Sequence, residues 1–274
     1  MGEDIGRRGR GVLSEGGAGS ARPRTSWDRE AVAELRGAVY RRDGQAVLDT
    51  LRGLGLEDVL QMAGDGLLVA LAKAVLEARE PAASCAALLR KRSNSGDEEL
   101  ADQLEVALGS RPDPMLRPLA VDLEDLSSML EGDLLRGGGR IDLESGETWP
   151  SGTEEVWGEE FSDEEDLDEA GSERWLWVEC LGSRDGYSDM EDFIGTVSDS
   201  RRQEMLELAI AGREAFRRFK DVLDRWPGEL ERWYLFSAER SRGRARAWLA
   251  GEGYRPAIGG VCSGALISPR SRMK

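Results

Sequence analysis

Gly212-Arg-Glu-Ala-Phe-Arg-Arg-Phe-Lys-Asp221 and Glu231-Arg-Trp-Tyr-Leu-Phe236 carry aromatic residues at helical spacing beside a dense set of basic ones. A Pro227-Gly228 pair separates the two stretches and predicts the end of one helix and the start of the next. Aromatic residues three or four positions apart share one face of a helix, so we expect them to form the packed seam of two C-terminal helices. The basic residues then fall on the outer faces. The aromatic residues predicted to face inward are Phe216, Phe219, Trp226, Trp233, Tyr234 and Trp248.

The sequence before this seam predicts further helices and a small sheet. Ser188-Asp-Met-Glu191 and Ser200-Arg-Arg-Gln203 have the capping-box pattern that opens a helix. Upstream, Gly139-Arg-Ile-Asp-Leu143 and Glu147-Thr-Trp149 flank a short turn, which is typical of a β-hairpin. Trp175-Leu-Trp-Val-Glu-Cys180 alternates in the same way. It is therefore expected to add a third antiparallel strand.

The N-terminal part has a purely helical pattern. In residues 26–109, apolar residues recur at helical spacing between glycine and proline breaks, which predicts four or five short antiparallel helices. Ser95-Gly-Asp-Glu98 is a capping-box pattern for the last of them. Residues 110–120 are predicted to be a stiff, proline-rich linker, because proline cannot donate a backbone hydrogen bond and restricts the residue before it.

These patterns predict an α+β protein. An N-terminal helical bundle is followed by a small three-stranded antiparallel sheet packed with C-terminal helices, and the sheet and these helices form a domain over residues 121–251. Residues 1–25 and 252–274 are rich in Gly, Ser, Pro and Arg and are expected to be disordered tails.

The segment 154–173 contains eleven acidic residues and no basic one. Like charges at this density resist collapse, so the segment is predicted to be a solvated, mobile loop. Two alternatives stay open: a mimic of nucleic acid, and an autoinhibitory contact with the basic C-terminal helices. A calcium-binding loop is rejected, because Ser162-Asp-Glu-Glu-Asp-Leu-Asp168 lacks the ligand register of such a loop.

Composition excludes several chemistries. The chain has 274 residues, a net charge of −16 and no histidine, which excludes a His-dependent nucleophile and a His-ligated metal. Cys85, Cys180 and Cys262 are far apart and odd in number, which fits buried thiols in a reducing compartment. No apolar run approaches the roughly 20 residues that span a bilayer, and no signal peptide is evident. We therefore expect a cytoplasmic protein with no membrane contact and no metal or other cofactor.

The basic residues near the C-terminus are the candidate binding face. Arginine forks suit phosphate groups, so this face is a candidate site for RNA, DNA or a nucleotide. The alternative is that the arginines pair with carboxylates such as Asp221 and Asp224, or neutralise the acidic loop. The net charge of −16 argues against broad, non-specific nucleic-acid binding but is compatible with a local basic face. The candidate residues are Arg213, Arg217, Arg218, Lys220, Arg240 and Arg244.

A group of acidic residues provides a weaker candidate. Asp189 and Asp192 are three residues apart on one helical face, near Asp185, and this spacing suits a magnesium site or an acid/base pair. The alternative is that these carboxylates stabilise a helix start through its dipole. No phosphate-binding loop and no nucleophile elbow occurs in the sequence.

The part of the chain from Asp122 to Ala250 resembles a bacterial family known as Uncharacterised Protein Family 0158. The resemblance is carried, in order, by Ile141-Asp-Leu-Glu-Ser-Gly-Glu-Thr148, Asp185-Gly-Tyr-Ser-Asp-Met-Glu-Asp-Phe-Ile194, the Gly212–Asp221 stretch and Arg232-Trp-Tyr234. The resemblance implies a shared fold and a bacterial origin, and it implies no reaction.

One position departs from the family pattern. The resemblance implies a glycine where this chain has Glu214, and this exchange predicts a more regular start of the following helix. The N-terminal helical region looks like an extension found in actinobacterial relatives.

The sequence contains no catalytic constellation. We therefore expect a non-enzymatic cytoplasmic interaction or regulatory protein with a protein partner. The first alternative is a nucleic-acid or nucleotide binder that uses the basic C-terminal helices. The second is a metal-dependent carboxylate enzyme that uses Asp185, Asp189 and Asp192.

Overall fold

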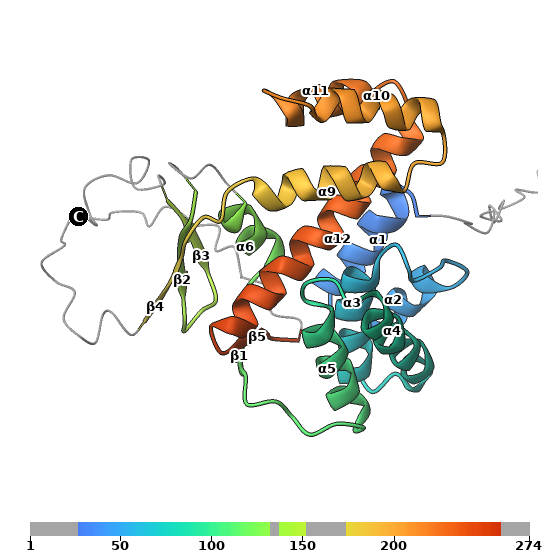
Figure 1. The fold of residues 1–274 in the computed structure, drawn as a ribbon. Coiled ribbons are helices and arrows are strands. Elements are labelled where there is room, and N and C mark those ends of the chain that lie inside the picture. Colours follow the sequence, from blue (N-terminus) through green and yellow to red (C-terminus); the bar gives the residue numbers. More distant parts are fainter. Residues whose placement is uncertain (1–26, 132–136, 152–173, 259–274) are drawn as a thin grey trace, which may run out of the picture.

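A computed structural model of the chain describes residues 27–131, 137–151 and 174–258 (Figure 1). The predicted tail at residues 1–25 and the acidic loop at 154–173 lie outside these residues. The predicted fold class is confirmed, since N-terminal helices precede a small three-stranded antiparallel sheet and C-terminal helices follow it.

The N-terminal helices surround α3, which is apolar around most of its circumference and buries ten of its thirteen residues. Leu35, Val47 and Leu100 of the neighbouring helices are fully buried against it in one hydrophobic cluster. A helix that is apolar on all sides belongs at the centre of a bundle. The elements are α1 (Arg29–Tyr40), α2 (Gly44–Leu51), α3 (Leu60–Ala72), the 3-10 helix η1 (Leu76–Ala78), α4 (Arg79–Arg92) and α5 (Asp97–Leu108).

The predicted helix starts hold only in part. At α5 the cap residue is Gly96, in a left-handed conformation, so Ser95 does not cap the helix as predicted. The reason is tertiary: Gly96 lies against the backbone of α12, and the buried Asp97 carboxylate instead accepts the backbone N–H of Asn94. Ser188 lies inside α9 (Arg184–Gly195) rather than at its start.

The sheet has the order β3-β2-β4 and is antiparallel throughout, as predicted. Its strands are β2 (Gly139–Asp142), β3 (Thr148–Pro150) and β4 (Trp175–Val178). Ile141 lies opposite Thr148 on one side and Leu176 on the other. Ile141, Leu176 and Val178 share the inner face and pack in one cluster with α6 (Leu123–Leu130) and the C-terminal end of α12.

A two-stranded parallel sheet joins distant parts of the chain. β1 (Arg117–Leu119) lies in the predicted linker, and β5 (Tyr254–Pro256) lies in the segment predicted to be a C-terminal tail. Tyr254 is buried in the cluster beneath the sheet. The folded part of the chain therefore extends beyond residue 252, although the sequence predicted a disordered tail from that residue onward. Pairing between strands this distant in sequence leaves no local signal.

The C-terminal helices enclose a third hydrophobic cluster. It joins α9, α10 (Ser200–Ile210), α11 (Ala215–Leu223) and the first half of α12 (Pro227–Gly251). Phe193, Phe219 and Trp233 meet there edge to face, with ring centroids 4.8–6.2 Å apart. The predicted aromatic seam is therefore present, but Phe216 and Tyr234 lie outside it, with 38% and 47% of their surface exposed. Trp248 also lies outside it, because it packs in the cluster beneath the sheet.

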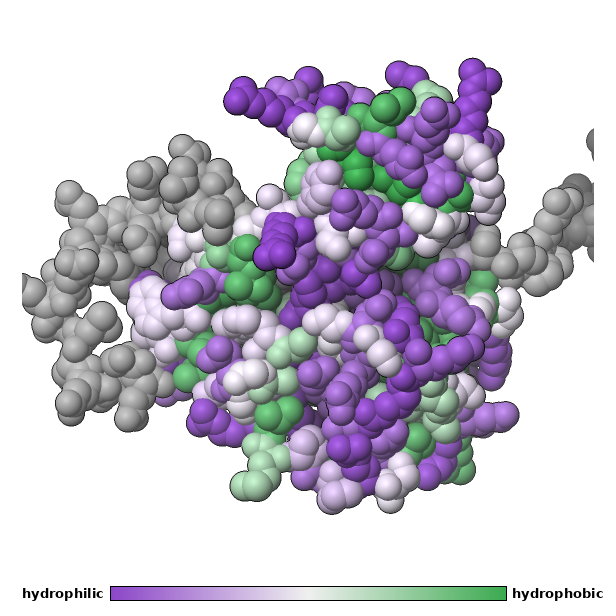
Figure 2. Space-filling view, in the orientation of Figure 1, coloured by the Kyte–Doolittle hydropathy of each residue, from purple (hydrophilic) through white to green (hydrophobic). Residues whose placement is uncertain are grey.

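α12 runs through the whole molecule. It contacts the N-terminal helices α3 and α5, the sheet-side elements α6 and β5, and the C-terminal helices α9 and α11 (Figure 1). In the space-filling view, apolar residues reach the surface near α10 and α11, beside a largely hydrophilic face (Figure 2). Within the described ranges, no helix is long and apolar enough to cross a membrane.

Glu214 does not give the regular helix start that its exchange for glycine predicts. The residue is the N-cap of α11 and has a φ of 59°, in the left-handed region, after Gly212 with a φ of 96°. The turn that glycine favours is therefore kept, although a side chain is present. Burial of Ala215 and Phe219 fixes the position of α11 and forces Glu214 into this conformation.

Glu214→Gly should raise the free energy of unfolding by about 0.5–1 kcal/mol, because a left-handed backbone strains a residue with a Cβ atom. Urea denaturation measures the difference. Glu214→Ala is the matched control: it removes the same exposed ion pair with Arg217 but retains the Cβ atom, and it should give no gain. Equal effects of the two substitutions would contradict backbone strain as the cause.

Cys85 of α4 should be unreactive in the folded protein. Its side chain is fully buried against the Leu60 carbonyl. Burial, with a smaller contribution from the Glu239 carboxylate, raises the pKa of the Cys85 thiol to about 12. In a Cys180→Ser/Cys262→Ser variant, we expect Cys85 to resist alkylation at mildly alkaline pH and to react once guanidinium chloride unfolds the chain. Rapid labelling under native conditions would contradict this packing.

Candidate functional site

The polar groups of this molecule gather along α12. Glu239, on its inner side, is only 6% exposed and accepts the backbone N–H groups of Gln61 (2.7 Å) and Met62 (3.0 Å). These donors belong to the first turn of α3, and Val59, which precedes α3, has no polar side-chain atom to accept them. Glu239 therefore caps a helix that lies 178 residues away in sequence.

The Glu239 carboxylate also receives Arg92 Nη1 at 3.3 Å. Burial raises the pKa of Glu239, while Arg92 and the two backbone donors act against this rise. Arg92 in turn forms a two-pronged contact with the buried Asp97 carboxylate, at 2.7 and 2.8 Å. These contacts join α3, α4, α5 and α12 in one polar cluster.

Arg246 is the largest fully buried side chain of the described residues and is 1% exposed. It donates to the side-chain oxygens of Gln61 (2.9 Å), Gln103 (3.2 Å) and Asp65 (2.6 Å). Arg242 donates to the other Asp65 oxygen at 2.7 Å. Burial opposes ionisation of Asp65, but the two guanidinium groups outweigh it and hold the pKa of Asp65 below its usual value.

Arg240 and Arg244, from the predicted binding face, point toward α9. Asp189 of that helix is 1% exposed and accepts Arg240 Nε at 2.9 Å and Arg244 at 2.8 and 3.1 Å. Arg240 also donates to Asp192 at 2.8 Å, and Arg244 donates to Glu131. The carboxylates that pair with these arginines thus come from α6 and α9, rather than from Asp221 and Asp224 as the sequence suggested.

The same arginines surround the carboxylates that the sequence suggested as a metal or acid/base site. Asp189 and Asp185 line one hollow between α9, α12 and the turn before α5. The Asp189 carboxylate is enclosed by two guanidinium groups, which neutralise it and occupy its oxygens. Within the described ranges, no group of three or more Cys, Asp or Glu residues has metal-binding geometry.

The other four candidate residues of the binding face lie on α11 or just before it. Arg213, Arg217 and Lys220 are exposed and Arg218 is half-buried. Arg217 pairs with Glu214 at 2.6 Å, and Arg218 donates to the Ala211 carbonyl. The candidate face is therefore split into an exposed part on α11 and an internal part on α12.

The outer face of the sheet carries an aromatic patch that sequence reasoning did not single out. Arg140 of β2 lies opposite Trp149 of β3 and Trp177 of β4. Its guanidinium stacks 4.6 Å from the Trp175 ring centroid and 6.0 Å from that of Trp177. Trp177 remains 59% exposed. The signal was present in the alternation of Trp175 and Trp177, which places both rings on the face opposite the core.

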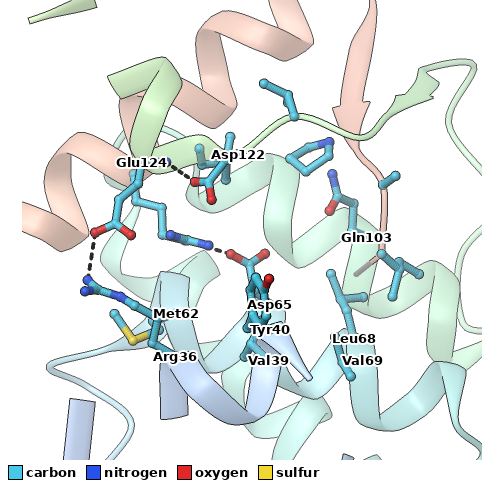
Figure 3. Close-up of a pocket in the computed structure, with 16 residues that line it drawn as sticks. Arg36, Val39, Tyr40, Met62, Asp65, Leu68, Val69, Gln103, Asp122 and Glu124 are labelled. Carbon is cyan, nitrogen blue, oxygen red and sulfur yellow. Dashed lines mark hydrogen bonds and ion pairs between the residues drawn. The ribbon is translucent and has the colours of Figure 1, made fainter. Parts of the chain in front are cut away.

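A pocket of about 200 Å³ lies where α1, α3, α6 and the end of β5 meet (Figure 3). Its floor and sides are largely apolar, and the Asp65–Arg242 and Arg36–Glu124 pairs form its polar edge. Gln103 from α5 also reaches it. Sequence patterns contain no sign of this pocket, because its walls come from six segments that are distant from one another in sequence.

These features define an α+β protein in which buried charged side chains join neighbouring helices. Residues 158–260 match the model of an uncharacterised protein family, UPF0158. A UPF0158 protein of Pseudomonas aeruginosa is 28% identical over 145 residues, which are 52% of this chain and 89% of that protein. Both matches support membership of this family for the C-terminal part of the chain. No solved structure matches it.

Proposed function

We propose that this chain is a non-enzymatic interaction protein that binds another protein in the cytoplasm. The observation that carries the proposal is the state of its charged groups. The carboxylates and guanidiniums with the least solvent exposure, including Asp189, Glu239 and Arg246, are engaged with one another or with backbone groups. Groups committed in this way hold helices together and are poor general acids, bases or nucleophiles.

The surface supports the same proposal. Open hollows along α12 combine apolar floors with charged rims, and the outer face of the sheet exposes Trp177 beside Arg140. Aromatic and arginine side chains are the residues most enriched at protein–protein contacts.

Nucleic acid is the second candidate partner. The exposed Arg213, Arg217 and Lys220 on and before α11 favour it, since basic side chains on one helix suit phosphate groups. Trp175 and Trp177 provide rings on which bases stack.

Affinity purification of the tagged full-length chain, with and without nuclease, separates the two candidates. We expect the same protein to be recovered in both preparations, and the purified partner to bind this chain again at a fixed ratio. Loss of all partners after nuclease treatment would favour nucleic acid. Failure of every recovered protein to rebind would contradict the interaction function.

A further inference from the structure

Three adjoining hollows follow one side of α12. Their volumes are about 190, 300 and 200 Å³. Arg36 of α1 and Met62 of α3 line all three. Tyr234 and Leu235 are shared by the first two, and Arg242 by the last two. Because neighbouring hollows share walls, they are parts of one groove, which we call the α1–α6 groove.

The groove has a helical floor and two helical walls. Tyr234, Leu235, Ala238 and Arg242 of α12 form the floor, at the spacing of one helix face. α1 and α6 stand on either side of it. From residue 231 to 242 the floor is about 16 Å long, or about three helical turns. This length suits a short helix, the ligand that commonly occupies an apolar groove between helices.

An ion pair bridges the groove. Arg36 of α1 donates to Glu124 of α6 at 2.7 Å, and the two side chains are 51% and 50% exposed (Figure 3). An exposed pair of this kind contributes little to stability. It can therefore rearrange when a ligand enters, and its two charges become available to that ligand.

The charge of the groove identifies the ligand. The residues that line the three hollows include three arginines and seven carboxylates. Four of these carboxylates already pair with arginines: Asp65, Glu124, Glu131 and Glu239. The acidic excess of the groove therefore comes from Asp28, Asp122 and Glu231, against Arg29. The chain as a whole has a charge of −16. The exposed Tyr234 ring adds a surface on which a Lys or Arg side chain stacks. A cationic ligand with apolar anchors is the complement of such a surface.

We propose that the α1–α6 groove binds a basic amphipathic helix of a partner protein. This inference rests on the proposed interaction function and names the chemistry of the partner. The apolar side of the helix lies on Tyr234, Leu235 and Ala238, and its Lys or Arg side chains face the acidic rim.

Fluorescence anisotropy with the full-length chain tests the proposal. The probe is a labelled Leu/Lys amphipathic helix of about 14 residues. A peptide of the same composition in scrambled order removes the apolar face, and a Leu/Glu helix reverses the charge. We expect saturable binding of the Leu/Lys helix, and binding of the other two weaker by about tenfold or more.

Two matched charge reversals locate the site. Glu231→Lys alters the rim of the groove, and Glu204→Lys alters an exposed position on α10 outside it. Both change the net charge of the chain by the same amount. Glu231→Lys should weaken binding about tenfold, and Glu204→Lys less than about twofold. Tyr234→Ala should weaken binding without altering the charge.

Several outcomes would overturn the inference: no binding of the Leu/Lys helix, equal binding of the scrambled peptide, or equal weakening by Glu231→Lys and Glu204→Lys. A dimer of this chain that Tyr234→Ala dissociates would also overturn it, because the groove would then hold a second copy. If a purified partner binds the chain but Glu231→Lys and Tyr234→Ala leave that complex unchanged, this inference fails while the interaction function stands.

Discussion

Arg246→Met should lower the free energy of unfolding by about 3–5 kcal/mol, the largest effect that we expect from a single side chain. The substitution keeps much of the volume but removes the donors to Gln61, Gln103 and Asp65. Two buried amide oxygens then lose a partner, and the Asp65 carboxylate retains only Arg242. Leaving buried polar groups without partners costs more than the hydrogen bonds themselves contribute. Urea denaturation, followed by circular dichroism, measures the loss.

Arg217→Met is the matched control for this substitution. Arg217 also pairs with a carboxylate, but the two side chains are 73% and 63% exposed. Its replacement should cost less than about 0.5 kcal/mol, since water screens such pairs. Equal free energies of unfolding for the two arginine variants would mean that the polar cluster around Arg246 does not stabilise the fold.

The contrast between these arginines shows what the sequence can predict. Local patterns found the helices, the hairpin and the third strand, because each depends on residues a few positions apart. The buried aromatic pair Phe219 and Trp233 followed from helical spacing alone. The contact between Arg246 and Gln61 could not be predicted in this way. The two residues are 185 positions apart, and local spacing carries no information about such a contact.

The same limit applies to the candidate binding face. Arg217 and Arg244 look alike in sequence, since both lie on basic helices. Arg244 faces inward because α9 presents the buried Asp189 to it, whereas no helix covers the Arg217 side of α11 within the described residues. Which arginines remain on the surface thus depends on the packing of whole helices. Of the six candidate residues, only Arg213, Arg217 and Lys220 keep the exposure that was expected of the face.

The N-terminal helices are more closely joined to the family-matching part than the linker suggested. Glu239 and Arg246 of α12 both bind residues of α3. Residues 158–260 match the family, but the described polar partners of these two side chains all precede residue 158. In this chain, therefore, Glu239 and Arg246 of α12 take their polar partners from the region that the sequence set apart as an N-terminal extension.

Gly243→Ala should lower the free energy of unfolding by about 3 kcal/mol. In the interior of a helix, an exchange of glycine for alanine ordinarily raises the free energy of unfolding by about 0.5–1 kcal/mol. The expected change therefore has the opposite sign to the usual one. The cause lies in the turn before α5: a Cβ atom on Gly243 would come within 2.2 Å of the Ser95 carbonyl oxygen. A backbone atom cannot move aside as a flexible side chain can. The turn and α12 would have to separate.

Gly228→Ala, in the first turn of the same helix, is the matched control. A Cβ atom there meets no described atom within 4 Å, so the substitution should be neutral or stabilise by up to about 0.5 kcal/mol. Urea denaturation of the two variants measures both changes. A stable Gly243→Ala protein would contradict the close approach of α12 to the Ser95 turn. Opposite shifts in the two variants would mean that backbone contact, rather than helix propensity, requires glycine at position 243, and that this contact holds the N-terminal helices against α12.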